Sequence, residues 1–223
     1  MAITLFLPLF MLFTFWISTR WDDPSEFDLM RYMYPAIVAI SIMLTGQTLA
    51  TRLNSWREQN IFQRLILTSV NLTHIMLGMT ITQIIMGIIQ GLAILIIGIF
   101  LLQIHISFLS FFSILGVIII TGLTFSAYGI FIATFTKKSE LTGYVFFFSL
   151  LPLYFLASFP TEMLPPSIQI ILPWLPTWMS IELIESAIYA QAFPPNGVFM
   201  ILGLVIYITI FALVSSRFFN WKD

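Results

Sequence analysis

Few residues of this chain have the side chains that catalysis or metal binding needs. Its 223 residues include no cysteine, so a thiol nucleophile and a cysteine-ligated zinc site are both excluded. The two histidines, His74 and His105, fall at opposite ends of one long apolar run, where they cannot share a metal ion. Lys138 and Ser139 form the one Lys-Ser pair, but the glycine-rich turn of a phosphate-binding loop does not precede them. We therefore expect no catalytic residue, no metal site and no cofactor site in this chain.

A charged segment between two apolar runs could instead support recognition of another protein. The segment SWREQNIFQRLILTSVN, residues 55–71, holds three of the chain's nineteen charged residues. At about 100° per residue, its side chains divide into a polar and an apolar stripe of a helix: Arg57, Asn60, Arg64 and Thr68 against Phe62, Leu65 and Ile66. This pattern predicts an amphipathic helix at the membrane surface. Such a helix could lie on lipid without a partner, or it could dock a cytoplasmic protein that uses charges of both signs.

The rest of the sequence is typical of an all-α integral membrane protein. Hydrophobic residues make up 59% of the chain and charged residues 9%, against about 25% charged in soluble domains. A helix that spans a bilayer needs about 20 mostly apolar residues, and six segments of a single domain, residues 1–223, meet that need. Their approximate ranges are 2–19, 32–53, 74–101, 109–135, 141–159 and 197–216. The first lacks the basic start and the cleavage site of a signal peptide, so we expect it to be an uncleaved span.

The distribution of lysine and arginine predicts the orientation of the chain. Six spans place both termini on one side of the membrane, and seven of the nine cations fall on that side: Arg52, Arg57, Arg64, Lys137, Lys138, Arg217 and Lys222. The opposite side has Arg20 and Arg31. Because cytoplasmic loops carry the excess of Lys and Arg, we expect both termini, and the segment 55–71, to be cytoplasmic.

A proline-rich apolar region lies between the fifth and sixth spans, at about residues 160–192. Most of the eleven prolines fall between residues 159 and 196, which excludes a straight spanning helix. We expect two short helices, near 166–172 and 178–190, that re-enter the membrane from outside, buried against protein. The alternative is a surface loop on the lipid headgroups, with Trp174 and Trp178 as interfacial anchors.

Apart from Arg52, at the cytoplasmic end of the second span, no charged residue falls inside a predicted span, which argues against transport driven by protons or sodium ions. The polar residues within the spans are uncharged, and five of them could line a weakly polar path: Gln47, Thr48, Gln83, Gln90 and Thr124. Each could equally form hydrogen bonds with a neighbouring helix. Small residues at Gly87, Gly91, Gly122, Ser126 and Gly129 favour close packing between helices.

Two stretches of the sequence resemble a known family of membrane permeases. RLNSWREQNIFQRLILTSVNLTHIMLGM is similar to the Arg-Glu-x-Gly-x-x-x-Arg-Leu-x-x-(Thr/Ser)-Pro loop of type-2 permeases of the ATP-binding cassette (ABC) superfamily. SFPTEMLPPSIQIILPWLPTWMSIELI is similar to that family's Ser-Gly-x-x-x-Pro-x-Glu-x-Leu-Pro stretch. The likeness extends from about residue 30 to the end. It departs from the family pattern at Asn60, Val70 and Phe159, where local bends are expected to differ.

The resemblance implies a permease subunit of an ATP-driven exporter in the cell membrane, as in bacteria. In the family the first stretch is a coupling helix that contacts a separate nucleotide-binding ATPase subunit, which holds ATP and magnesium; here it would comprise Trp56, Arg57, Glu58, Phe62, Arg64 and Leu65. The second forms re-entrant helices, and a gate there would involve Pro160, Glu162, Pro165 and Glu182.

A second permease copy, or a similar chain, would complete a dimer with a path for drugs, antibiotics, peptides or lipids. The net charge of −1 indicates no nucleic-acid partner. The alternative function is a membrane scaffold or immunity protein that does not transport.

Overall fold

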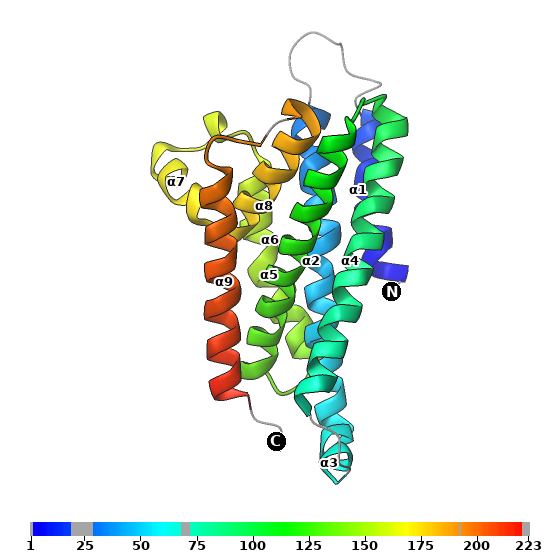
Figure 1. Ribbon diagram of the computed structural model, residues 1–223, viewed down its shortest axis with the longest axis vertical. Coiled ribbons are helices and arrows are strands. Elements are labelled where there is room, and N and C mark those ends of the chain that lie inside the picture. Colours follow the sequence, from blue (N-terminus) through cyan, green and yellow to red (C-terminus); the bar gives the residue numbers. More distant parts are fainter. Residues whose placement is uncertain (1, 19–28, 68–71, 192, 220–223) are drawn as a thin grey trace.

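The computed structural model describes residues 2–18, 29–67, 72–191 and 193–219, and within these residues it contains helices and connecting turns but no strand (Figure 1). The long helices are α1 (Ala2–Ser18), α2 (Leu29–Glu58), α4 (Leu72–Leu102), α5 (Phe108–Phe135), α6 (Ser139–Ser158) and α9 (Gly197–Phe218). The short helices are α3 (Ile61–Ile66), α7 (Pro166–Ile171) and α8 (Pro176–Glu185). Single turns named η1 (Thr161–Met163), η2 (Leu172–Trp174) and η3 (Ser186–Ala190) adjoin the helices α7 and α8.

Five of the described helices are long and apolar enough to cross a membrane. These are α2, α4, α5, α6 and α9, whereas α1 is a shorter apolar helix. The all-helical class predicted from the sequence is therefore confirmed, and the chain is a multi-pass membrane protein. The long helices also begin and end close to the six predicted ranges, with the largest difference at α2, which continues past residue 53 to Glu58.

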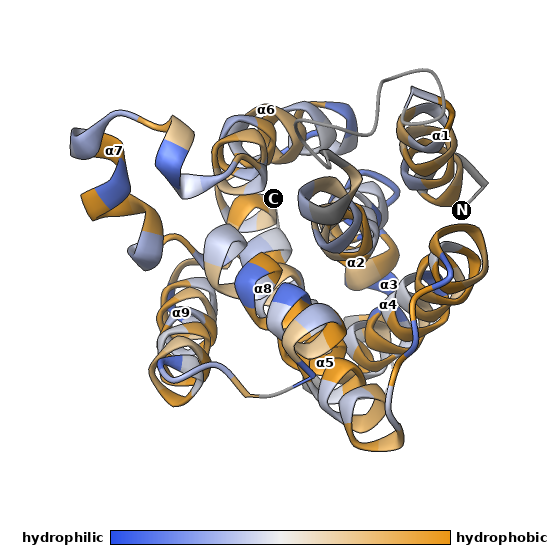
Figure 2. Ribbon diagram, turned by 90° about the horizontal axis from the view of Figure 1, so that it is seen from above, coloured by the Kyte–Doolittle hydropathy of each residue, from blue (hydrophilic) through white to orange (hydrophobic). Residues whose placement is uncertain are grey.

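Helix α2 forms the centre of the bundle. Viewed from above, it lies among α1, α4, α5 and α6 (Figure 2), and it packs against these helices and α8. Tyr34, Ile37 and Met43 on α2 are fully buried. The Tyr34 hydroxyl donates to the Leu95 carbonyl of α4 over 2.7 Å, so this buried hydroxyl has a hydrogen-bond partner within the core.

Two glycines bring the backbones of α2 and α5 into direct contact. A Cβ atom at Gly46 would overlap the backbone carbonyl of Phe125, and a Cβ atom at Gly129 would overlap that of Gly46. No side chain fits between the helices at this crossing, as is typical where small residues let membrane helices approach. The close helix packing that the sequence predicted at Gly129 is therefore a contact between α5 and α2.

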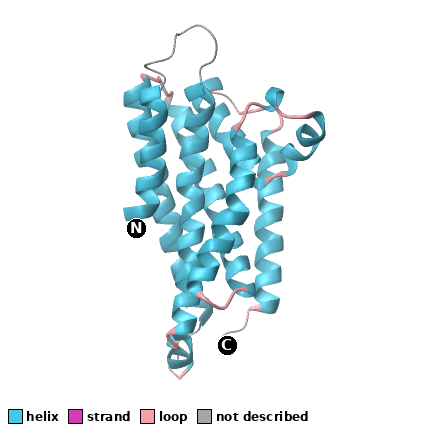
Figure 3. Cartoon of the chain, turned by 180° about the vertical axis from the view of Figure 1, so that it is seen from behind, coloured by secondary structure: helices cyan, strands magenta, loops and turns pink. Residues whose placement is uncertain are grey.

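The two ends of the bundle differ in what they carry. The start of α1, the end of α9, the turn between α5 and α6 and the short helix α3 all point toward one end, called here the α3 end (Figures 1 and 3). The segment from η1 to η3 lies toward the opposite end. Apolar side chains cover the outward faces of the long helices, including Ile81, Ile85 and Ile89 on α4, each about half exposed. Such faces suit hydrocarbon rather than water.

Candidate functional site

The charged segment at the α3 end is a helical corner rather than one helix. Helix α2 runs through Arg57 to Glu58, the chain turns at Gln59 and Asn60, and α3 begins at Ile61. Asn60 has φ 55° and ψ 26°, a left-handed conformation that interrupts the helix. The prediction of a continuous helix over 55–71 is therefore wrong, and residues 68–71 lie outside the described part of the chain. Asparagine is among the few residues other than glycine that adopt the left-handed region readily.

Arg57 is buried at the end of α5 and does not face solvent. Its side chain is 7% exposed, and Nη1 donates to the carbonyls of Ala133 over 3.2 Å and Thr136 over 3.0 Å. These carbonyls belong to the last turn and the C-cap of α5, which lack partners within their own helix. The guanidinium also lies 4.5 Å from the centre of the Phe219 ring. A cation here complements the negative end of the α5 dipole.

Glu58 binds the start of α6. Its Oε1 accepts from the Ser139 backbone N–H over 3.0 Å, and its Oε2 accepts from the Ser139 hydroxyl over 3.0 Å. Ser139 is the first residue of α6, and the N-cap residue, Lys138, makes no side-chain cap bond of its own. The Glu58 carboxylate therefore supplies the cap from another helix, and its negative charge complements the positive end of the α6 dipole.

One helical turn before Arg57 and Glu58, a buried polar cluster also joins α2 to the connection between α5 and α6. The Asn54 side-chain Nδ2 lies 2.9 Å from both the carbonyl and the hydroxyl of Thr136, and close to the Thr142 hydroxyl. The two threonine hydroxyls are 2.7 Å apart. All three residues are buried. Together with Arg57 and Glu58, this cluster fixes the end of α2 to the turn between α5 and α6, so that these elements form one connected unit.

The tip of the corner is partly apolar. Phe62 on α3 is 1% exposed and packs on Trp56, with 5.9 Å between their ring centres. Leu65 is half-buried, while Arg64 is exposed and donates from Nη2 to the Gln59 carbonyl over 3.2 Å. Of the six predicted coupling residues, Arg64 alone points its charge to solvent without binding another helix. The sequence pattern could not reveal the burial of Arg57, because its partners lie 76 and 79 residues further along the chain.

At the opposite end, α8 inserts between the long helices. It packs against α2, α5, α6 and α9, and buries residues such as Thr177, Met179 and Ile184. The Thr177 hydroxyl donates to the Leu153 carbonyl of α6 over 3.2 Å. In contrast, α7 buries no residue and projects from the side of the bundle (Figures 1 and 2). Within the proline-rich region, α8 is therefore packed inside the bundle, whereas α7 lies on its surface.

Three of the four predicted gate residues meet at one hollow. Pro160, Glu162 and Glu182 line a cavity of about 120 Å³, together with Glu185 and Tyr32. Pro165 is instead the N-cap residue of α7 and does not line it. Burial raises the pKa of the Glu182 carboxyl. Sequence reasoning missed Glu185, although its spacing of three residues from Glu182 places both on one face of a helix.

The five predicted path residues are not gathered on one open surface. Gln83, Gln90 and Thr124 are buried inside the bundle, and the Thr124 hydroxyl donates to the Ile120 carbonyl of its own helix. Gln47 donates from Nε2 to the Gly143 carbonyl of α6 over 3.0 Å, and Thr48 donates to Leu44 on α2. Gln47 therefore links α2 to α6, whereas the Thr48 and Thr124 hydroxyls bond within their own helices. No group of three or more metal-binding side chains occurs among the described residues.

Comparison with models of known protein families identifies a match over most of the chain. A family model described as an ABC-2 family transporter protein matches residues 22–213, a range that includes α2 through most of α9. The match therefore covers both the corner at the α3 end and the proline-rich region at the other end. No curated protein matches the sequence.

Proposed function

The chain belongs to the ABC-2 transporter family, and from this premise we propose that it is the six-span permease subunit of an ATP-driven exporter, with both termini in the cytoplasm. A membrane permease of this family works with an ABC ATPase subunit. The α3 end is then cytoplasmic, in agreement with the exposed cations Arg52, Arg64, Lys137, Lys138 and Arg217 on that side. Nucleotide and magnesium bind to the ATPase and not to this chain.

The corner formed by the end of α2 and α3 is the proposed docking element. It extends beyond the rest of the bundle (Figure 3) and presents Glu58, Gln59, Asn60 and Arg64 as exposed polar groups. Trp56 and Phe62 support it from the inside. Charge complementarity with a partner cleft sets the register of docking, while each exposed charge pair contributes about 1 kcal/mol or less.

The observation that carries this proposal is the double attachment of Arg57 and Glu58. A partner that displaces the corner also displaces the end of α5 and the start of α6, because these two residues bind both helix ends. Closure of the ATPase can therefore reach three long helices through one contact. A helix that merely lay on lipid would not need this connection.

The opposite end is the proposed site of substrate release. The hollow lined by Pro160, Glu162 and Glu182 and the helix start at Pro165 form the proposed outer gate. A second permease copy, or a similar chain, would provide the other half of the path for a hydrophobic or amphipathic substrate. Of the predicted path residues, Gln47 and Thr48 are only partly buried in the single chain.

Co-expression with an ABC ATPase encoded in a neighbouring reading frame tests the function. We expect the ATPase to co-purify with the chain, and ATP to drive export of fluorescent amphipathic drugs or labelled lipids in proteoliposomes. Arg64→Glu should weaken the association, because it reverses a charge at the exposed corner. Absence of any bound ATPase, together with normal folding of the chain, would favour the scaffold or immunity function.

A further inference from the structure

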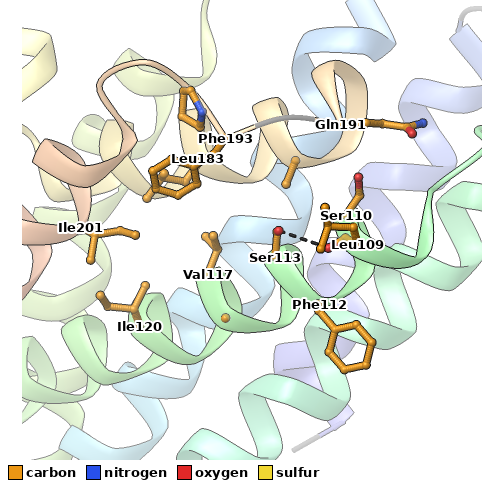
Figure 4. Close-up of a pocket in the computed structure, with 13 residues that line it drawn as sticks. Leu109, Ser110, Phe112, Ser113, Val117, Ile120, Leu183, Gln191, Phe193 and Ile201 are labelled. Atoms are coloured by element: carbon orange, nitrogen blue, oxygen red, sulfur yellow. Dashed lines mark hydrogen bonds between the residues drawn. The ribbon is translucent and has the colours of Figure 1, made fainter.

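A second and larger cavity lies between α5, α8 and α9, away from the corner and from the proposed gate. It has a volume of about 380 Å³ and is lined by the first half of α5, by α8 and η3, and by the start of α9 (Figure 4). Leu109, Val117, Leu183 and Ile201 are among its lining residues. Its size is within the range of about 300–1,000 Å³ that is usual for small-molecule sites.

The exposed residues around this cavity favour hydrocarbon over water as its surroundings. Two of its walls, α5 and α9, are helices long and apolar enough to cross a membrane. At its edge, Leu109 is 75% exposed and Phe112 is 52% exposed. In Figure 4 the Phe112 ring points outward from α5, away from the other lining side chains. A space that opens on such a face is accessible to lipid chains, and an empty space would forfeit dispersion contacts along its walls.

The polar groups of the lining are already engaged within the protein. The Ser113 hydroxyl donates to the Leu109 carbonyl over 3.2 Å, and the Ser110 hydroxyl lies 2.8 Å from that of Ser107. Gln191 donates from Nε2 to the His105 carbonyl, and its side chain points away from the cavity (Figure 4). A polar ligand would therefore find few free partners here, whereas an alkyl chain requires none.

One glycine keeps the cavity open at the backbone of α5. A Cβ atom at Gly116 would meet no atom within 4 Å, so the cavity reaches the helix backbone at this residue. Glycine inside a helix is destabilising by roughly 0.5–1 kcal/mol relative to alanine. A Cβ atom at this position would enter the space without a steric clash, and a longer side chain would occupy more of it.

We propose that this cavity binds one acyl chain of a bilayer phospholipid, from the leaflet at the end opposite α3. The chain would lie along α5 past Gly116, between α8 and the start of α9, with its headgroup at the membrane surface. Binding of this lipid does not require export or an ATPase partner. The lipid would occupy the space between the first half of α5 and the start of α9, beyond the part where the two helices pack together.

Photo-crosslinking of the full chain tests the proposal. The purified protein is reconstituted in nanodiscs that contain a phospholipid with a diazirine in its acyl chain, then illuminated, digested and analysed by mass spectrometry. We expect crosslinks on residues 109–120 and 187–201, in addition to general lipid contacts on the exposed face of α4. Crosslinks spread evenly over α4, α5 and α9, or absent from these two ranges, would overturn the proposal.

Two variants and a matched control make the result specific. Gly116→Leu should abolish the crosslinks on the cavity walls, and Ala187→Leu, which fills the cavity from η3, should do the same. Gly78→Leu is the control, because a Cβ at Gly78 on α4 also meets no atom within 4 Å but Gly78 does not line the cavity. Unchanged wall crosslinks in both filled variants, each with wild-type thermal stability, would exclude an acyl chain in this cavity.

Discussion

Arg57 and Glu58 are neighbours in the sequence, yet they bind to the ends of two different helices. Arg57 donates to the last carbonyls of α5, while Glu58 accepts from the first residue of α6. Each charge has the sign that its helix end requires. The pair therefore stabilises the turn between α5 and α6 from a third helix, and this relationship leads to the first two predictions.

Replacement of Arg57 should reduce the stability of the folded chain. We expect Arg57→Ala to lower the free energy of unfolding by about 1.5–3 kcal/mol, because two hydrogen bonds from a charged donor to α5 are lost. Arg64→Ala is the matched control and should change stability by about 0.5 kcal/mol or less, as an exposed arginine. Thermal unfolding of both purified variants in detergent measures the difference. Equal stability of the two variants would contradict the role assigned to Arg57.

Replacement of Glu58 should affect coupling more than insertion into the membrane. Glu58→Ala removes the cap of α6, a loss of about 0.5–2 kcal/mol in similar cases. We expect reduced substrate-stimulated ATP hydrolysis in the reconstituted complex, with normal amounts of membrane-inserted protein. Glu140→Ala removes the same charge from the first turn of α6 without removing a cap bond, and should retain coupling. Glu58→Asp, which keeps the charge, should restore part of the activity if capping is the cause.

The crossing of α2 and α5 should not tolerate any side chain. We expect Gly46→Ala to prevent normal folding, because its Cβ would overlap the Phe125 carbonyl and neither backbone can yield easily. Gly78→Ala, where the Cβ meets open space, should be tolerated or slightly stabilising. Size-exclusion chromatography of the two variants after extraction gives the comparison. A monodisperse Gly46→Ala protein with wild-type stability would show that the two backbones are further apart.

The orientation of the chain can be measured with single cysteines, since the natural sequence has none. We expect a cysteine at Asn60 to react with a membrane-impermeant maleimide only after cells are opened, and one at Asn196 to react in intact cells. Asn60 lies in the corner at the α3 end, and Asn196 is the N-cap residue of α9 at the other end. Labelling of residue 60 from outside would reverse the orientation and remove the basis for an ATPase contact at this corner.

The stability of the folded chain should depend on pH through Glu182, which lines the hollow near α8. Burial raises the pKa of this carboxyl, so the folded chain binds a proton more tightly than the unfolded chain does. Stability should therefore decrease as the pH rises from the unfolded pKa through the folded one. We expect Glu182→Gln to remove this part of the slope in melting temperature. Glu162→Gln, at the edge of the same hollow, is the control, and an identical loss of slope in both variants would argue against Glu182 as the source.

Much of the architecture could be predicted from the sequence because hydropathy alone limits where membrane helices can lie. The long apolar runs predicted the long helices, and the prolines near 160–176 predicted short broken elements instead of another span. Helical periodicity could not detect the break at Asn60, since the end of one helix and the start of the next can present the same polar and apolar pattern as one continuous helix. The departure from the family's glycine was the available signal, because glycine and asparagine share the left-handed region.

The site was harder to predict than the fold for a specific physical reason. Charges in a polar segment are ordinarily solvated, so Arg57 and Glu58 were expected to face a partner. Their actual partners are helix ends that come close only after α2, α5 and α6 have packed. The contact of Gly46 with Phe125 is equally invisible in a sequence, which shows small residues but not which helix they meet.

The position of Gly46 has a mechanical consequence for α2. This helix has 30 residues, so it is about 45 Å long, and Gly46 lies near its middle, where the α5 backbone leaves no space for sliding. The contact at Gly46 is therefore a point about which α2 could pivot. A sideways displacement of the Glu58 end would then move the Met30 end, which lies at the other side of the membrane next to α1, in the opposite direction.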